Sequence, residues 1–352
     1  MKNILFLVIL LSLFSCQNKT NEKTDFETIN VTEFKNQTIA LEEMVSSVEI
    51  LKLHTDTTGY IGQIEDVDAI DSSLYILDVI TSSIFQFNRK DGTLLHRIST
   101  RGKGPLEYIQ PMALTTDSNH LYVLDILGMA ILSYNKNLQA ERKISITFPC
   151  LDFIRTKQGF LCYNMAPTET LKQIVYLDQE GKIIDSYQLD NSKNGLSAGA
   201  KIFTQDAQGK IFVTTTFSSV IYAWNESLTR LEKLLTFDFA SYNIPSDMEV
   251  ERVNIFQKPY AIPSQFFHIK NAYLRSFIFR SKRYYCLKST SNQKIGTISG
   301  ESAYPFFPRW QIGDCLIGTC SEDFFLSFYR MLDLLELDIG IVHNHLQSVH
   351  ES

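Results

Sequence analysis

Short runs rich in apolar residues, separated by polar turns, recur along most of this chain, and the second run of each clear pair alternates apolar and polar residues. The clearest runs come in pairs, which are Leu74–Asp78 with Ile84–Asn88, Leu121–Asp125 with Ile131–Asn135, and Ile211–Thr215 with Ile221–Asn225. In each pair, an aromatic residue of the first run precedes the final Asn of the second by 13 residues. Alternation bounded by turn residues is typical of β-strands. Each pair therefore predicts two strands of a repeated unit.

Each unit continues through a turn into a third predicted strand. These third strands cover residues 93–98, 140–146 and 182–189. Gly92 and Gly181 stand at hairpin corners, where glycine supplies the positive φ that such turns demand. Weaker copies of the unit are the pair Gly159–Asn164 and Ile174–Asp178, and the run Arg283–Leu287.

Units of this kind cannot bury both of their faces alone, but units placed side by side share a continuous core. The chain from Val48 to about Arg330 has room for about six units of roughly 40–50 residues. The alternating segment Val48–Leu53 suits a strand that closes a ring by pairing with the other end of the chain. Closure removes the exposed edges that an open solenoid or a sandwich must cap. The sequence therefore predicts an all-β fold, a six-bladed β-propeller over residues 41–338.

Two regions near the C-terminus depart from the repeat. Ser321 can cap a helix, acidic residues follow it, and apolar residues of the segment 321–337 fall on one helical face. This pattern predicts a short C-terminal helix docked on the ring. The remaining segment, 339–352, contains His343, His345 and His350, is polar, and does not predict a strand.

A third departure is the segment 244–267, which contains three prolines and four aromatic residues. A long excursion from a regular ring is a good candidate for a specific surface, because loops carry function. A lid packed on its own blade is an equally good interpretation.

The N-terminus has the features of an export signal. Lys2 precedes the apolar run Ile4–Leu11, and the segment ends at Leu13-Phe14-Ser15-Cys16. The run is typical of a secretory signal peptide and is too short for a membrane span of about 20 apolar residues. Its last four residues resemble the lipobox of bacterial lipoproteins, a family in which the peptide is cleaved before an acylated Cys. The expected organisation is a signal peptide at 1–15, a lipid on Cys16 and a polar tether over 16–40. An ordinary signal peptide without a lipid is the alternative.

Composition and charge bear on two questions, which are whether the protein binds nucleic acid and whether it contains disulfide bonds. The net charge is −6 and no basic cluster occurs, which argues against nucleic-acid binding. Apart from Cys16, the chain has an odd number of cysteines, namely Cys150, Cys162, Cys286, Cys315 and Cys320. An odd set within apolar runs predicts buried thiols rather than a disulfide framework, with a single disulfide as the alternative.

No segment carries a specific catalytic or metal-binding motif. Five acidic residues are spread over the repeats, namely Asp68, Asp71, Asp78, Asp117 and Asp125. Such residues could hold Ca²⁺ in a central channel. Asp78 and Asp125 recur at one repeat position, however, and this favours turn capping. The letters Gly195-Leu196-Ser197-Ala198-Gly199 match a nucleophile elbow, but they lie in a polar stretch without the strand and helix that the elbow requires. We therefore expect no catalytic residues, no metal ligands and no cofactor.

A family resemblance supports the fold. The leader with Cys16, the segment Ser47–Leu53 and the Leu-Tyr-Ile-Leu-Asp repeats resemble the six-bladed β-propeller lipoproteins of Gram-negative gut bacteria, which are relatives of NHL-repeat propellers. Between the first two repeats, Arg101–Tyr108 is similar to the Gly-x-Gly-Pro-Gly-Glu-Tyr segment of that family, with Leu106 in place of the last Gly. The segment also resembles a phosphate loop in its glycines, but it lacks the Walker spacing, and we interpret it as a connector between blades.

The resemblance implies an exported lipoprotein of the cell envelope, anchored in the outer membrane. Rings of the NHL type most often act as binding platforms, so we expect a monomeric binding protein with a protein or glycan ligand rather than an enzyme. The alternatives are a lactonase-type hydrolase with Ca²⁺ in the channel and a structural envelope protein.

Overall fold

The computed structural model describes residues 26–40, 45–55, 60–190, 201–215, 217–246, 248, 254–269, 272–289, 291–299, 316–321, 324–330 and 339–346. For residues 45–50 and from 298 onwards, only the backbone is described. The expected signal peptide and Cys16 lie outside the described residues, as does the Gly195–Gly199 segment.

The strands form antiparallel sheets of four consecutive strands, and the first three sheets follow the repeats found in the sequence. Sheet 1 comprises β4 (Ile64–Ile70), β5 (Ser73–Asp78), β6 (Ser83–Asn88) and β7 (Leu94–Ile98). Sheet 2 comprises β8 (Pro111–Thr116), β9 (His120–Asp125), β10 (Ala130–Asn135) and β11 (Ala140–Ser145). Sheet 3 comprises β12 (Cys150–Arg155), β13 (Gly159–Asn164), β14 (Ile174–Asp178) and β15 (Ile183–Tyr187).

The next two sheets are extended by strands from the N-terminal part of the chain. Sheet 4 comprises β16 (Phe203–Gln205), β17 (Ile211–Val213), β18 (Val220–Asn225) and β19 (Arg230–Asp238), with β1 (Glu27–Asn30) parallel to β19. Sheet 5 comprises β20 (Ile262–Ile269), β21 (Ala272–Phe279), β22 (Lys282–Ser289) and β23 (Gln293–Ser299), with β2 (Thr38–Ala40) parallel to β23.

The last sheet joins the C-terminal end of the described chain to a strand from its N-terminal part. Sheet 6 comprises β24 (Leu316–Ser321), β25 (Phe324–Arg330), β26 (Ile339–Leu346) and β3 (Val45–Lys52). Strand β3 pairs with β26, so the expected pairing of the Val48–Leu53 segment with the C-terminal end is observed.

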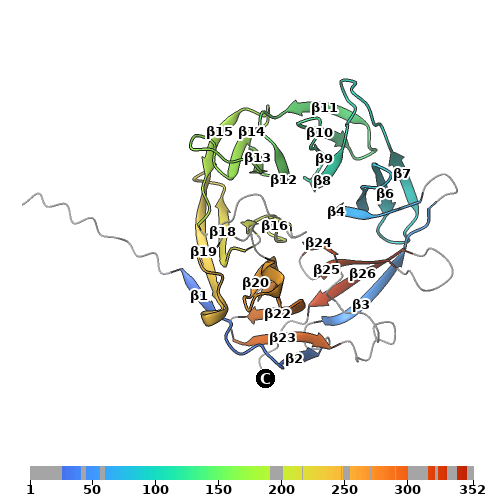
Figure 1. Ribbon diagram of the computed structural model, residues 1–352. Coiled ribbons are helices and arrows are strands. Elements are labelled where there is room, and N and C mark those ends of the chain that lie inside the picture. Colours follow the sequence, from blue (N-terminus) through green and yellow to red (C-terminus); the bar gives the residue numbers. More distant parts are fainter. Residues whose placement is uncertain are drawn as a thin grey trace, which may run out of the picture.

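The sheets are arranged around a central axis (Figure 1). Their innermost strands contact one another in the order β4, β8, β12, β16, β20 and β24, and β24 contacts β4. Because each sheet packs its faces against its two neighbours, the hydrophobic core consists of layers between adjacent sheets. In one such layer, Tyr176 of sheet 3 lies against Trp224 of sheet 4 with the ring centroids 4.9 Å apart. The fold is an all-β β-propeller.

The repeats found in the sequence correspond to the second and third strands of the sheets. Leu74–Asp78 forms most of β5 and pairs with β6, and the matching runs form β9 with β10 and β17 with β18. Gly92 and Gly181 adopt φ of 71° and 83° in the turns before the fourth strands, as predicted. The expected connector at Arg101–Tyr108 is also observed, because Gly102 N–H bonds the Tyr108 carbonyl and Gly104 N–H bonds the Glu107 carboxylate.

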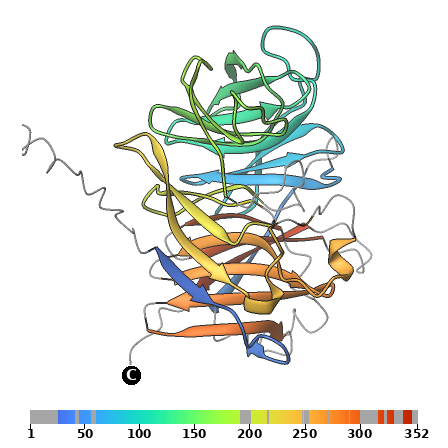
Figure 2. The same ribbon diagram turned by 60° about the vertical axis from the view of Figure 1, so that its left-hand side comes forward.

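The predicted tether over 16–40 is too long. Residues 27–30 and 38–40 form strands, and Figure 2 shows β1 lying along β19. The reason is apolar burial, because Ile29, Val31, Phe34 and Ile39 are all at most 2 % exposed. Four apolar side chains offset the entropy of ordering a segment that is otherwise polar.

The predicted C-terminal helix is wrong, and so is the expectation that the tail contains no strand. Residues 324–330 form β25, and residues 339–346 form β26, which pairs with both β25 and β3. The run Phe324–Arg330 is rich in aromatic residues, which favour strands, and short apolar runs do not separate helix from strand by spacing alone. Two neighbouring strands satisfy its backbone, and this tertiary pairing outweighs the local helical pattern.

The segment 244–267 is a connector only in its first part. It includes a short 3-10 turn at Ile255–Gln257, and Ile255 packs on Phe217 and Ile262. From Ile262 the chain is already in the innermost strand β20 of sheet 5. Ile255 thus contacts residues of sheets 4 and 5, and the two interpretations of the segment, a specific surface and a lid, stay predictions. Within the described part of the chain, no helix is long and apolar enough to span a membrane.

Candidate binding cleft and central channel

The central channel contains an ion pair that joins opposite sides of the ring. Lys201, just before β16, places its Nζ 2.5 Å from Oδ1 of Asp66 on β4. Asp66 is 4 % exposed, whereas Lys201 is 23 % exposed. Asp68 and Asp152 line the same small hollow in the channel as Lys201.

The carboxylates of the channel also bind backbone groups of neighbouring sheets. Oδ2 of Asp66 accepts the N–H of Leu114 at 2.8 Å, and Oδ2 of Asp152 accepts the N–H of Ile202 at 2.8 Å. Oδ2 of Asp68 accepts both the N–H and the hydroxyl of Thr116. Each of these aspartates therefore ties one innermost strand to the innermost strand of the next sheet.

Burial and Lys201 act in opposite directions on these carboxylates. Burial raises the pKa of Asp152 to about 6, although the Lys201 ammonium lowers it. Burial likewise raises the pKa of Asp68 against the same opposing charge. For Lys201, burial lowers the pKa, but the three carboxylates outweigh burial and the pKa is raised. The ammonium is thus the built-in counter-ion of the channel.

This donor set does not fit a channel Ca²⁺ site. Calcium takes 6–8 oxygen ligands, whereas the oxygens of Asp66, Asp68 and Asp152 accept bonds from backbone N–H groups and face Lys201. Among the described side chains, no group of three or more His, Cys, Asp or Glu is placed to hold a metal ion.

The other acidic residues considered for metal binding have structural contacts. Asp78 accepts the N–H groups of Gly62, Gln63 and Ile80, and Asp125 accepts those of Ile109, Gln110 and Gly128. Both aspartates therefore cap a turn and fix the connector that precedes their sheet's first strand, which confirms the interpretation from the repeat. Asp71 is exposed and pairs with Lys136.

A larger hollow lies between sheets 2 and 3. Its volume is about 440 Å³, and it is bounded by side chains from both sheets and from the turn after β8. Its inner wall contains Tyr122 and Phe160, whose ring centroids are 5.2 Å apart, and Arg155, whose guanidinium lies over both rings. We refer to this hollow as the cleft.

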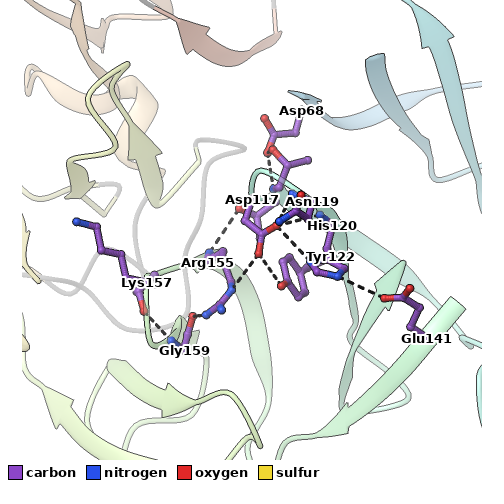
Figure 3. A network of polar contacts seen from close by, with 12 residues as sticks. Asp68, Asp117, Asn119, His120, Tyr122, Glu141, Arg155, Lys157 and Gly159 are labelled. Atoms are coloured by element: carbon purple, nitrogen blue, oxygen red, sulfur yellow. Dashed lines mark hydrogen bonds and ion pairs between the residues drawn. The ribbon is translucent and has the colours of Figure 1, made fainter. Parts of the chain in front are cut away.

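Asp117 organises the polar part of the cleft (Figure 3). Its carboxylate accepts the Tyr122 hydroxyl at 2.8 Å and lies 3.6 Å from Nε of Arg155. Burial raises the pKa of Asp117, but hydrogen bonds from Asn119 N–H, the Tyr122 hydroxyl and His120 N–H outweigh burial and lower it. Asp117 is therefore a carboxylate at neutral pH.

Tyr122 remains protonated in the same setting. Burial and the Asp117 carboxylate raise the pKa of its hydroxyl to about 12. The wall of the cleft thus presents a neutral hydroxyl, a carboxylate and a guanidinium side by side.

The rim of the cleft is polar and balanced in charge. Nε2 of His120 lies 3.4 Å from the Glu141 carboxylate. Arg142 of sheet 2 reaches across to Glu180 of sheet 3 at 3.4 Å. These four side chains are accessible, so ligand groups can exchange with the existing contacts.

The cysteines in the described part of the chain are reduced and buried, as predicted for Cys150, Cys162 and Cys286. Burial raises the pKa of the Cys286 thiol to about 12, which makes it unreactive. The side chains of Cys315 and Cys320 are not described, so the alternative of a single disulfide, for which the sequence names no partners, stays a prediction.

The sequence identified Asp68 and Asp117 as acidic residues but did not bring either to a site. It missed Asp66, Asp152, Lys201 and Arg155, all near innermost strands. The signal that could have identified them is a charged residue in or beside the first strand of a repeat. Side chains at that place face the channel or the next sheet. Two histidines also take part in such contacts, because His120 lines the cleft and His268 pairs with Asp206 at 2.8 Å.

Comparison with known proteins agrees with a β-propeller. One similar crystal structure is that of a Bacteroides fragilis protein whose name describes it as exported. The two chains share 17 % sequence identity with a TM-score of 0.73, over 91 % of this chain and 99 % of that one. A member of the DUF4221 family from Bacteroides vulgatus has 11 % identity and a TM-score of 0.57, over 87 % and 98 % of the two chains. These likenesses establish the fold class.

Residues 26–340 match the family described as a domain of unknown function, DUF4934, and the chain belongs to this family. No curated protein matches it.

Proposed function

We propose that this chain is an exported binding protein, anchored to the cell envelope by a lipid on Cys16, which binds a small polar ligand in the cleft between sheets 2 and 3. The observation that carries this proposal is the cleft itself. Its volume of about 440 Å³ lies within the range of roughly 300–1,000 Å³ that is usual for ligand pockets.

The ligand class follows from the chemistry of the cleft wall. Acceptors and donors alternate there, because Asp117 and Glu141 stand among Arg155, Arg142 and His120. A strongly charged ligand would meet a repulsive group wherever it found an attractive one. A neutral ligand with many hydroxyl groups can instead donate to the carboxylates and accept from the guanidinium groups. The ligand we propose is one or two sugar residues of a glycan.

Direct binding measurements test this ligand class. The full chain is titrated with a panel of neutral mono- and disaccharides by calorimetry. Glu141→Ala and Arg142→Ala should each weaken the binding of any active sugar by about tenfold or more, a loss of roughly 1.4 kcal/mol. The control variants are Glu232→Ala and Arg230→Ala, because Glu232 and Arg230 form a similarly exposed pair on β19.

The proposal fails if no sugar of the panel binds, or if both cleft variants bind as the unaltered protein does. A ligand surface on a protein partner, or a purely structural role in the envelope, would then be the better account.

Export and anchoring rest on the Lys2–Cys16 segment, and the name of the similar Bacteroides fragilis protein supports export alone. We propose the outer membrane as the location. Radiolabelled palmitate should enter the unaltered protein and not Cys16→Ala, and the labelled form should separate with outer-membrane vesicles. Equal labelling of the variant would overturn the lipid assignment.

We also propose that sheet 6 acts as a sixth blade, which completes one closed propeller. The pairing of β3 with β26 and the contacts of β24 with β4 and β20 support this. A blade closed by strands from both chain ends prevents the ring from opening at an edge.

A further inference from the structure

A buried arginine lies between sheets 4 and 5, away from the cleft. Arg275 is on β21 and is 0 % exposed. Its Nη1 donates to the hydroxyl of Thr214 at 2.7 Å, and its Nη2 donates to the carbonyl of Ser218 at 2.9 Å. Both partners are neutral. The ring of Phe237 lies 5.9 Å from the guanidinium carbon.

The charge of this guanidinium persists in the fold. Burial lowers the pKa of Arg275 to about 9, so the side chain still carries its proton at neutral pH. None of the ion pairs between described residues includes Arg275. A buried charge without an opposite charge is strongly destabilising in a protein interior. The position therefore favours an anion beside the guanidinium.

Unpartnered buried polar atoms occur both on Arg275 and on the segment that it contacts. Nε of Arg275 is buried and has no hydrogen-bond partner among the described residues, and the same holds for the hydroxyl of Thr215. The hydroxyl groups of Thr214 and Thr215 are also buried, and that of Thr214 accepts from Arg275 and keeps its own proton to donate, whereas the hydroxyl of Ser218 already donates to the Asp190 carbonyl at 3.4 Å. Phe217, in the turn between β17 and β18, has a φ of 73°, which is unfavourable for a residue with a bulky side chain. Such a conformation persists only where the surrounding structure enforces it.

We propose that Arg275 and the hydroxyl groups of Thr214 and Thr215 bind a small monovalent anion, such as chloride, between sheets 4 and 5. A guanidinium whose Nε–H has no partner among the described residues, together with the neutral hydroxyl groups of Thr214 and Thr215, suits a compact anion that accepts hydrogen bonds. A large or multiply charged anion does not suit a fully buried position. The bound anion would neutralise Arg275 and hold sheets 4 and 5 together.

Salt-dependent unfolding of the full chain tests the proposal. Raising sodium chloride from 10 to 300 mM should raise the unfolding temperature by about 2–5 °C more than sodium gluconate at equal ionic strength, because chloride binds only the folded state. The same titration with sodium formate distinguishes two kinds of anion site. A rise with chloride alone indicates a halide site, and a rise with formate as well indicates a site that also accepts a carboxylate. The difference between salts should disappear in Arg275→Met and persist in Arg230→Met. An identical response to both salts in the unaltered protein would overturn the proposal.

A second measurement holds even if Arg275→Met fails to fold. Crystals of the unaltered protein grown with sodium bromide should show an anomalous peak in contact with the Arg275 guanidinium. A water molecule or an acidic side chain at that place, with no bromide, would contradict the anion site.

Discussion

Asp117 and Asp206 occupy corresponding places in two sheets, and each carboxylate reaches a basic side chain on the innermost strand of the following sheet. Asp117 directly follows β8 and pairs with Arg155 of β12, and Asp206 directly follows β16 and pairs with His268 of β20. Both carboxylates also accept backbone N–H groups of their own turn. Each of these two aspartates thus stabilises the turn that it begins and links its sheet to the next one.

The Asp206 pair predicts an acid-dependent loss of stability. Burial raises the pKa of Asp206, but the His268 bond and the turn N–H groups outweigh burial and lower it. A carboxyl whose folded pKa lies below its unfolded value stabilises the fold above the unfolded pKa, here about 3.8, and loses this effect as the pH falls further. Asp206→Asn should therefore lower the free energy of unfolding by about 1–3 kcal/mol at pH 7.

The deficit of Asp206→Asn should shrink below pH 4, because the unaltered protein then loses the same charge. Urea unfolding at several pH values measures both quantities. Asp71→Asn is the control, because its carboxylate is exposed and forms a surface pair. A deficit of Asp206→Asn that does not change with pH would contradict this account.

The channel counter-ion predicts the opposite dependence on pH. The pKa of Asp152 is raised to about 6, so the folded state binds a proton that the unfolded state lacks between about pH 3.8 and 6. Stability from this group therefore falls as the pH rises through that window. Lys201→Met removes the charge that opposes the shift, and it should cost about 3–5 kcal/mol at pH 7.5 and less at pH 5.

Urea unfolding of Lys201→Met at pH 5 and 7.5 tests this dependence. Lys136→Met is the control, because the Lys136–Asp71 pair is exposed and should contribute little at either pH. An equal deficit at both pH values would mean that Lys201 does not compensate the channel carboxylates.

The strand pairs were predictable because the local pattern and the tertiary role of β5, β6, β9 and β10 agree. β5 and β9 are continuous apolar runs, and β6 and β10 combine apolar with polar residues. Their turns contain Gly or Asp, and the neighbouring sheets bury all four strands. Prediction failed where these levels disagree. Segment 324–330 has helical spacing but strand pairing, and segment 27–40 is polar overall but contains four buried apolar residues.

The N-terminal segment therefore predicts a measurable contribution to the core. Phe34 is 0 % exposed and meets the rings of Phe277, Phe279 and Tyr284 at centroid distances of 5.0 to 5.2 Å. Phe34→Ala should lower the free energy of unfolding by about 3–5 kcal/mol. Phe26→Ala, at a residue that is 39 % exposed, should change it by about 0.5 kcal/mol or less. Similar small effects of both variants would restore the tether interpretation for this segment.

The candidate sites were less predictable than the strands, because they combine residues far apart in the sequence. Asp66 and Lys201 meet only across the closed ring, and Asp117 meets Arg155 only when two sheets pack side by side. The repeat did identify Asp78 and Asp125 as turn caps, since one sheet supplies their whole environment. A site between two sheets is made of residues that differ from one repeat to the next. A single sequence does not show which of these residues lie close together in the fold.

Strand β26 provides a direct test of ring closure. It pairs with β25 on one side and with β3 on the other, so its loss would leave two unpaired edges and detach β3 from the C-terminal end of the chain. Deleting residues 339–352 should lower the free energy of unfolding by more than about 4 kcal/mol, or cause aggregation through the exposed edges. Deleting only residues 347–352 keeps all of β26 and serves as the control. Thermal unfolding followed by circular dichroism, with light scattering for aggregation, separates the two outcomes. If both deletions unfold at the same temperature as the full chain, β26 does not close the ring, and the role proposed for sheet 6 fails with it.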